Sequence, residues 1–121
     1  MRKSSGVLLQ FQNEFLLLLR SPKMETFSNM WSIPAGGSKE DETPEETAIR
    51  ELFEETGIEI SNLSLQTIVE SMDEIFYFYH KEIEIKIKPE LNWEHTEWGY
   101  FTEDNLPQPM WPKIKEVIDR L

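Results

Sequence analysis

Two apolar runs lie close to the N-terminus and are separated by the polar pair Gln12 and Asn13. Residues 4–11 and 14–20 have the length of β-strands, and their apolar residues mostly follow one another without polar interruptions. Continuous apolar runs of this length indicate strands that are covered on both faces of a sheet. The sequence therefore predicts two neighbouring strands with apolar layers on either side.

The polar segment 21–29 contains Pro22 and is predicted to be a loop. A short strand is expected at residues 30–34. Residues 35–37, which include two glycines, are predicted to form a turn. Glycine allows backbone conformations and close approaches that a side chain forbids.

The clearest element is a helix that begins after Thr43 and runs to Thr56. Thr43 is a suitable N-cap, Pro44 suits the first helical position, and Glu46 completes a capping box. Gly57 is the expected C-terminal stop. The apolar side of this helix is expected to consist of Ala48, Ile49, Leu52 and Phe53.

The C-terminal half predicts strands at residues 63–70, 74–80, 82–88 and 96–101, and an amphipathic helix at 111–121. The third of these strands alternates strictly between apolar and charged residues, as a half-exposed strand does. Strands and helices in this order predict an α/β (α+β) sandwich with a mixed sheet between helices.

The composition suits a single globular domain over residues 1–121. The chain has 39% hydrophobic and 12% aromatic residues, and 121 residues are too few for two ordinary domains. The absence of cysteine excludes disulfides, thiolate metal sites and cysteine nucleophiles. No apolar run approaches the roughly 20 residues that span a bilayer, and none has the pattern of a signal peptide. We therefore expect a cytoplasmic protein without membrane contact.

The charge is strongly acidic, with 23 acidic against 12 basic residues and a formal net charge of −11. A DNA or RNA duplex would be repelled, and no basic stripe offsets this repulsion. An acidic balance can serve solubility alone, or some of the acids can be grouped to hold a divalent cation. Only the positions of the acids distinguish these two interpretations.

Glu51, Glu54 and Glu55 have the i, i+3, i+4 spacing that brings side chains together on a helix. Carboxylates so placed repel one another by a few tenths of a kcal/mol per pair, roughly. They could form a solvated acidic face. They could also bind Mg²⁺ or a similar hard cation, which prefers carboxylate, carbonyl and water oxygens.

The neighbouring residues favour the cation. Arg50 precedes Glu51 and lies one turn before Glu54, where a guanidinium can orient carboxylates. The glycine pair Gly36 and Gly37 can bring backbone carbonyls toward the same acids. No histidine or cysteine cluster indicates a zinc site.

These residues form a long, gapped motif. Five residues separate Gly36 from Glu42, and seven more lead to the run Arg50-Glu51-Leu52-Phe53-Glu54-Glu55-Thr56-Gly57-Ile58. The motif resembles a complete Nudix box. Residues 31–37 also resemble the segment that leads into the box in this family. The resemblance implies a Nudix-type α/β/α sandwich and hydrolysis of a diphosphate linked to a nucleoside and another moiety.

The resemblance also implies roles for individual residues. Mg²⁺ or Mn²⁺ would be bound by Glu51, Glu54 and Glu55 with the Gly36 carbonyl, while Arg50 orients the glutamates and Glu42 supports the loop. Two positions depart from the common pattern: Asp41 replaces a frequent glycine and Gly37 a frequent basic residue. These departures bear on loop shape and phosphate contacts.

A further acid of the site usually comes from a late loop in this fold. The segment 94–101 resembles that region, and its spacing favours Glu94 as an added metal ligand or general base, with Glu97 as the alternative. With Glu54 and Arg50, Glu94 makes up the expected catalytic set. His95 is expected to be structural, or to lie at the rim of the site.

Substrate contacts are expected from Arg20, Trp31 and Lys39. Arg20 ends a strand near the expected cleft and could meet a phosphate, although a plain surface arginine fits equally well. Trp31, with Phe27, Phe76 and Tyr77, could stack on a base, but aromatic residues more often belong to a core.

The preferred function is hydrolysis of a (deoxy)nucleoside triphosphate or modified nucleotide by a monomer or homodimer. ADP-ribose or another nucleotide sugar is an alternative substrate. A nucleotide-sensing Nudix module without catalysis is disfavoured, because such modules lose box glutamates. A purely structural acidic domain would leave the whole motif as coincidence.

Overall fold

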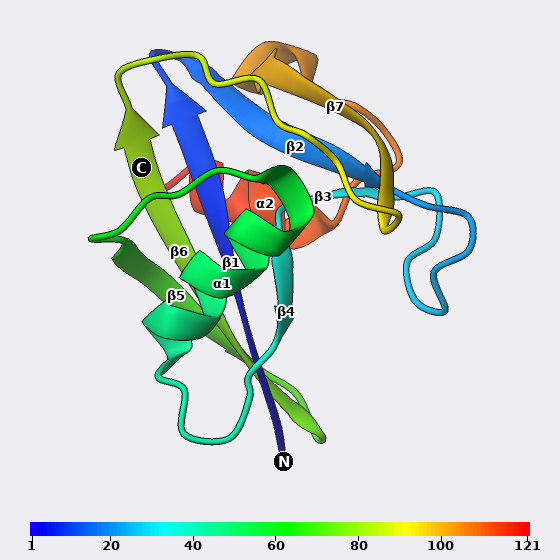
Figure 1. Ribbon diagram of the computed structural model, residues 1–121. Helices are drawn as coiled ribbons and strands as arrows, with labels where there is room; N and C mark the ends of the chain where they lie inside the picture. Colours follow the sequence, from blue (N-terminus) through cyan, green and yellow to red (C-terminus); the bar gives the residue numbers. More distant parts are fainter.

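The computed structural model describes residues 1–121 as one mixed sheet and two α-helices (Figure 1). Neither helix is both long and apolar enough to cross a membrane. The elements, in chain order, are β1 (Arg2–Phe11), β2 (Glu14–Arg20), β3 (Trp31–Ser32), β4 (Ala35–Gly37), α1 (Pro44–Thr56), β5 (Ser64–Glu70), β6 (Glu74–Ile83), β7 (His95–Thr102), the 3₁₀ turn η1 (Glu103–Asn105) and α2 (Pro112–Ile118).

The sheet has the order β3-β2-β1-β6-β5, with β4 paired to β1 and β7 paired to β2. β1 and β6 are parallel along their whole length, and all other pairs are antiparallel. Along the remaining edge of β1, the first half pairs with β4 and the last two residues pair with β2. β2 and β4 therefore pair with different parts of the same edge of β1, and the site described below lies beside β4 and the end of β2.

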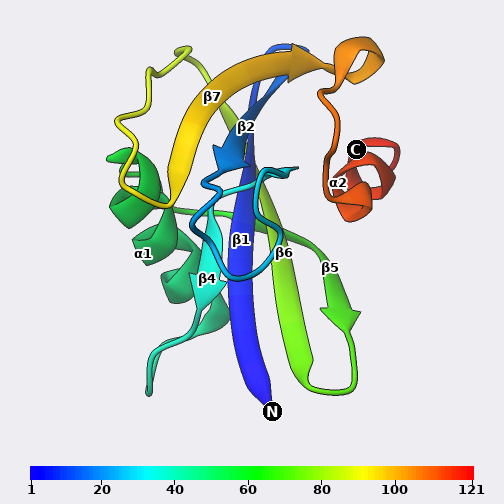
Figure 2. The same ribbon diagram turned by 90° about the vertical axis from the view of Figure 1, so that its right-hand side faces the viewer.

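The two helices cover opposite faces of the sheet, as Figure 2 shows. Successive residues of β1 point to opposite faces, so Leu8 joins the core under α2 while Val7 and Leu9 join the core under α1. Ala48 and Leu52 bury the inner side of α1, and Ile114 and Val117 bury that of α2. The predicted α/β sandwich with a mixed sheet between helices is confirmed.

Helix α1 begins and ends at the predicted residues. Thr43 accepts a hydrogen bond from the Glu46 N–H (3.2 Å), and the Glu46 carboxylate accepts one from the Thr43 N–H (2.8 Å). Gly57 ends the helix in the left-handed region, at φ 76°. Ile49 is half-buried as expected, but the prediction for Phe53 is wrong, since its side chain is 50% exposed.

Residues 35–37 form a strand and not the predicted turn. Their backbone pairs with β1, from Ser4↔Gly37 to Gly6↔Ala35. None of the three residues has a positive φ. Gly36 therefore permits a close approach, because a Cβ on this residue would lie 2.3 Å from Cδ of Glu51.

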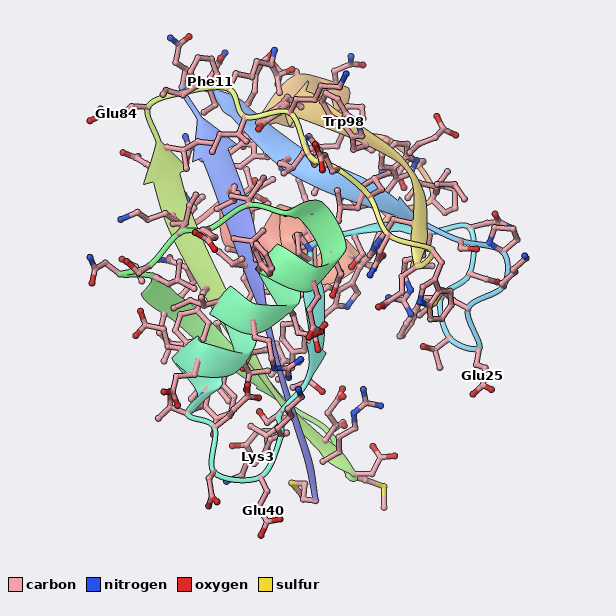
Figure 3. All side chains as sticks on the ribbon, viewed as in Figure 1. Lys3, Phe11, Glu25, Glu40, Glu84 and Trp98 are labelled. Carbon is pink, nitrogen blue, oxygen red and sulfur yellow. The ribbon has the colours of Figure 1, made fainter.

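The strand predicted at residues 82–88 is also wrong. Strand β6 continues to Ile83 and the chain then bends, because β1 ends at the register pair Phe11↔Ile83 and offers no partner beyond it. Glu84 points away from the molecule there (Figure 3). The alternation still has a structural basis: Ile83 and Ile87 pack on the α1-side core, and Ile85 is exposed.

Candidate active site

Helix α1 divides its three motif glutamates between the interior and the surface. Glu55 is fully buried and Glu51 is 8% exposed, whereas the side chain of Glu54 is 44% exposed. This division follows from the position of α1, which packs Ala48 and Leu52 on the sheet and turns the adjacent edge toward β4. The three carboxylates therefore share a region but not an environment.

Arg50 connects the helix to the loop that precedes it. Its guanidinium donates to Glu42 through Nε (2.6 Å) and Nη2 (3.0 Å), and through Nη1 to Glu51 (2.9 Å) and Glu54 (3.0 Å). These hydrogen bonds, those to Glu42 above all, raise the pKa of Arg50 and lower the pKa of Glu42 to about 2. The expected roles of Arg50 in orienting carboxylates and of Glu42 in holding the loop both agree with this geometry.

Glu55 lies at the centre of the cluster with little to neutralise it. Its Oε1 accepts a hydrogen bond from the Ala35 N–H (3.3 Å), and its Oε2 is buried without a partner. Burial, reinforced by the carboxylates of Glu51 and Glu94, raises the pKa of Glu55 well above its ordinary value. The site therefore groups carboxyl groups in a place that water does not solvate, where the ionised form of Glu55 is disfavoured unless a cation is bound.

The backbone of β4 runs beside these carboxylates. Ala35 donates to Glu55, and the Gly37 carbonyl accepts from Nη2 of Arg50 (2.9 Å), so the polar groups of both residues face α1. Backbone groups of successive strand residues alternate between the two edges. Gly36 therefore directs its own N–H and carbonyl toward β1, while its Cα permits the close approach of Glu51.

The structure places the two late acids differently. Glu94 is half-buried just before β7, and its pKa is raised by burial and by Glu51. Its main-chain carbonyl accepts from the Ser21 N–H (2.7 Å), which joins this loop to the end of β2. Glu97 is exposed on β7, opposite Leu19. Only Glu94 is brought to the cluster.

His95 is buried inside the site and not at its rim. It is 4% exposed, and its Nδ1 lies 3.7 Å from Oε1 of Glu55. Burial, with a contribution from the positive charge of Arg20, lowers the pKa of His95 to about 4, so the imidazole is neutral at pH 7. Sequence reasoning missed this contact, because the two residues are brought together only by the pairing of β7 with β2.

Of the expected substrate residues, only Arg20 lies beside the acids. It is partly buried at the end of β2, donates through Nε to the Thr26 carbonyl (3.0 Å), and interacts electrostatically with Glu55 and Glu94. Lys39 is exposed in the loop before α1; the next residue in this loop, Glu40, is labelled in Figure 3.

Most of the aromatic candidates belong to the cores. Trp31 packs edge-on against Phe101 at 5.2 Å on the α2 side, and Phe76 packs against Trp111 at 5.1 Å. Tyr77 is half-buried against the α1-side core. Phe27 is the exception, at 63% exposed in the loop that follows Arg20.

Carboxylate oxygens are the ligands that a hard cation prefers, but the acidic side chains do not converge on one point. No three of the acidic or histidine side chains are arranged to hold a metal ion in this structure. Arg50 instead holds Glu51 and Glu54. The unpartnered Oε2 of Glu55 is a free carboxylate oxygen of the type that Mg²⁺ and Mn²⁺ bind.

The fold and the site are those of the Nudix class, whose sequence motif this chain resembles. A sequence model described as NUDIX domain matches residues 2–121, and the chain belongs to this family. The RNA pyrophosphohydrolase of Bartonella tribocorum is 41% identical over 56 residues, which cover 46% of this chain and 30% of that protein. The 8-oxo-dGTP diphosphatase of Proteus vulgaris is 32% identical over 62 residues, covering 51% and 54% of the two chains.

The matched segments thus span less than two thirds of either relative. A solved structure described as a MutT NUDIX hydrolase from Burkholderia pseudomallei has a TM-score of 0.86 to this chain. That likeness covers 99% of this chain and 97% of the other at 23% identity, and it shows the shared fold.

Proposed function

We propose that the protein is a metal-dependent pyrophosphohydrolase that cleaves the diphosphate of a nucleotide. The observation that carries this proposal is Glu55, a fully buried carboxyl group with one unpartnered oxygen and two further carboxylates close by. Such a cluster costs stability unless something offsets its charge, and a divalent cation would do so.

Mg²⁺ or Mn²⁺ would be held by Glu51, Glu54 and Glu55, with Glu94 as a further ligand. A backbone carbonyl of β4 completes the set. The family resemblance assigns this carbonyl to Gly36, but the alternation of β4 supports Ala35, whose N–H already faces Glu55. When bound, the metal would neutralise the diphosphate and make an attacking water more acidic.

The chain itself would orient the reacting groups. Arg50 and Glu42 fix the helix against its preceding loop, so that Glu51 and Glu54 keep their positions when substrate binds. In its alternative role, as general base and not as a ligand, Glu94 would accept a proton from the attacking water, and its raised pKa favours this role. Arg20 would contact a phosphate oxygen, since it lies beside the same acids.

We favour a (deoxy)nucleoside triphosphate or modified nucleotide as the substrate. A second candidate is the phosphorylated end of an RNA, which the relatives named RNA pyrophosphohydrolase support. The net charge of −11 disfavours binding of long nucleic acids, so single nucleotides are the preferred substrates. ADP-ribose or another nucleotide sugar is a further alternative. A sensing module without catalysis is disfavoured because all three glutamates of the motif are present.

A phosphate-release screen with Mg²⁺ and Mn²⁺ tests the proposal. The panel contains nucleoside triphosphates, 8-oxo-dGTP, triphosphorylated RNA, dinucleoside polyphosphates and nucleotide sugars. Glu54→Gln should lower turnover of the best substrate by about a hundredfold or more, as expected for lost charge stabilisation at a reaction centre. No release from any substrate, or an unaffected Glu54→Gln variant, would refute the proposal.

A further inference from the structure

Unpartnered polar atoms are concentrated at one contact in the interior. Four buried side-chain nitrogen or oxygen atoms have no hydrogen-bond partner in the whole chain, and three of them belong to Glu55 and His95. Both side chains are completely shielded from solvent. Buried polar groups without partners are rare in folded proteins and destabilise them, so this pair calls for a physical explanation.

The two carboxylate oxygens of Glu55 have different surroundings. Its Oε1 faces the protein, where the Ala35 N–H donates at 3.3 Å and Nδ1 of His95 lies 3.7 Å away. Its Oε2 has no donor at all. At 3.7 Å, Nδ1 lies just beyond hydrogen-bond distance of Oε1, so the imidazole would have to move closer to donate, and a bond to Oε1 would leave Oε2 without a donor.

His95 is well anchored for such a role. It begins β7, where it pairs with Arg20 just beyond a register shift in the β2–β7 ladder. Its N–H donates to the Asn92 carbonyl (3.4 Å), and it directly follows Glu94. The residue that follows the late acid therefore also reaches the buried glutamate of α1.

We propose that His95 is a positioning residue: its Nδ1–H donates to Oε1 of Glu55 and keeps Oε2 directed toward the divalent cation. This inference rests on the proposed function, because it concerns the metal expected there. Residues that hydrogen-bond to a ligand's second atom fix its orientation, and their loss weakens metal affinity by roughly 10–100-fold.

The test compares replacements that keep or remove a donor at the Nδ1 position. His95→Asn places an amide N–H near Nδ1, His95→Gln carries its amide farther out, and His95→Leu removes both nitrogens. His80→Leu is the matched control, since His80 bonds Gln10 and lies outside the site. Calorimetry measures the Mn²⁺ dissociation constant of each full-length variant, and circular dichroism in chelator establishes its folding.

We expect His95→Leu to weaken Mn²⁺ binding by roughly 10–100-fold, with His95→Asn much closer to the parent. His80→Leu should bind as the parent does. If His95→Leu folds poorly, the comparison of Asn with Gln decides, because only Asn restores the donor at Nδ1.

Equal affinity of His95→Leu and the parent, or of the Asn and Gln variants, would overturn the positioning role. Equal loss in the Asn and Leu variants would overturn it too, by making the imidazole itself a ligand. A parent protein that binds no Mn²⁺ would overturn the proposed function and this role with it.

Discussion

Glu54 and Glu55 are neighbours in sequence, yet their side chains meet different environments. Glu54 lies at the surface and accepts hydrogen bonds from Arg50, whereas Glu55 is enclosed by β4, His95 and the sheet. An exposed carboxylate is stabilised by water, but a buried one must be protonated or paired. At the scale of single residues, burial therefore decides whether a carboxyl group is ionised without a partner.

Glu55→Gln should therefore stabilise the metal-free protein at alkaline pH. The folded-state pKa of Glu55 is raised, so the folded state holds its proton more tightly than the unfolded state does. Stability from this group is present at low pH and is lost as the pH rises through the folded pKa. Glutamine cannot ionise, so the Glu55→Gln variant should not lose this stability as the pH rises.

Urea unfolding in chelator at several pH values, from pH 4.5, the ordinary pKa of this carboxyl group, up to about pH 9, measures this effect. The parent should lose more stability across this pH range than Glu55→Gln does. Parallel curves for parent and Glu55→Gln would contradict the assignment of a raised pKa to this residue.

A second prediction at this scale separates the two late acids. Glu94→Gln should lower turnover by roughly a hundred- to ten-thousandfold, the range for a lost general base. Glu97→Gln, on the exposed side of β7, should behave as the parent does. Steady-state kinetics with the best substrate of the screen gives the comparison, and the reverse ranking would transfer the role to Glu97.

At the scale of elements, the site depends on how closely β4 approaches α1. The short strand occupies the edge of β1 that β2 leaves free, and it reaches the helix through Ala35 and Gly37. Glu51 lies against Gly36, where a Cβ would have to displace its carboxylate. The glycine pair, which suggests a turn in the sequence, thus acts within a strand.

Gly36→Ala and Gly37→Ala form a matched pair that tests this approach. A Cβ at position 36 would lie 2.3 Å from Cδ of Glu51, whereas one at position 37 would be in ordinary contact, 3.6 Å from Arg2. We expect Gly36→Ala to cost about 1–3 kcal/mol, typical of overpacking, and to weaken metal binding. Gly37→Ala should change stability by less than about 0.5 kcal/mol.

Denaturant unfolding and Mn²⁺ titration of both variants provide the measurement. Similar stability and affinity in the two alanine variants would show that Glu51 can move aside, and that the close contact is not needed.

At the scale of the whole molecule, a mixed sheet between two helices brings distant segments to one place. The site draws on β2, β4, α1 and the start of β7, which lie far apart in the sequence. The resulting cluster combines several acids with Arg20 and Arg50. Global stability should therefore depend on whether a cation offsets the remaining negative charge.

Addition of Mg²⁺ or Mn²⁺ should raise the melting temperature of the protein and restore activity lost to chelator. A ligand that binds only the folded state stabilises it by about 2.7 kcal/mol at a concentration 100 times its Kd. Scanning calorimetry across a metal titration tests this, with Glu55→Gln as the variant that should respond least. A melting temperature that does not change while activity saturates would place the metal elsewhere.

The sequence by itself determined the features that depend on near neighbours. The caps of α1 and the contacts of Arg50 with Glu51 and Glu54 were predicted correctly, because helix contacts join residues close in sequence. The roles of the glutamates as metal ligands stay a prediction. Strands β1 and β2 were located from continuous apolar runs, and strands β5–β7 were also predicted close to their observed bounds. The composition and motif also indicated the fold and the family.

Only the tertiary structure decided which of these residues meet. Residues 35–37 form a strand because β1 offers them a free edge, and the alternating segment after Ile83 forms none because β1 has ended. His95 reaches Glu55 only through the pairing of β7 with β2. Trp31 packs against the α2-side core because β3 pairs with β2. Strand pairing joins residues of any separation, so a local pattern shows that a strand can form but not what lies beside it.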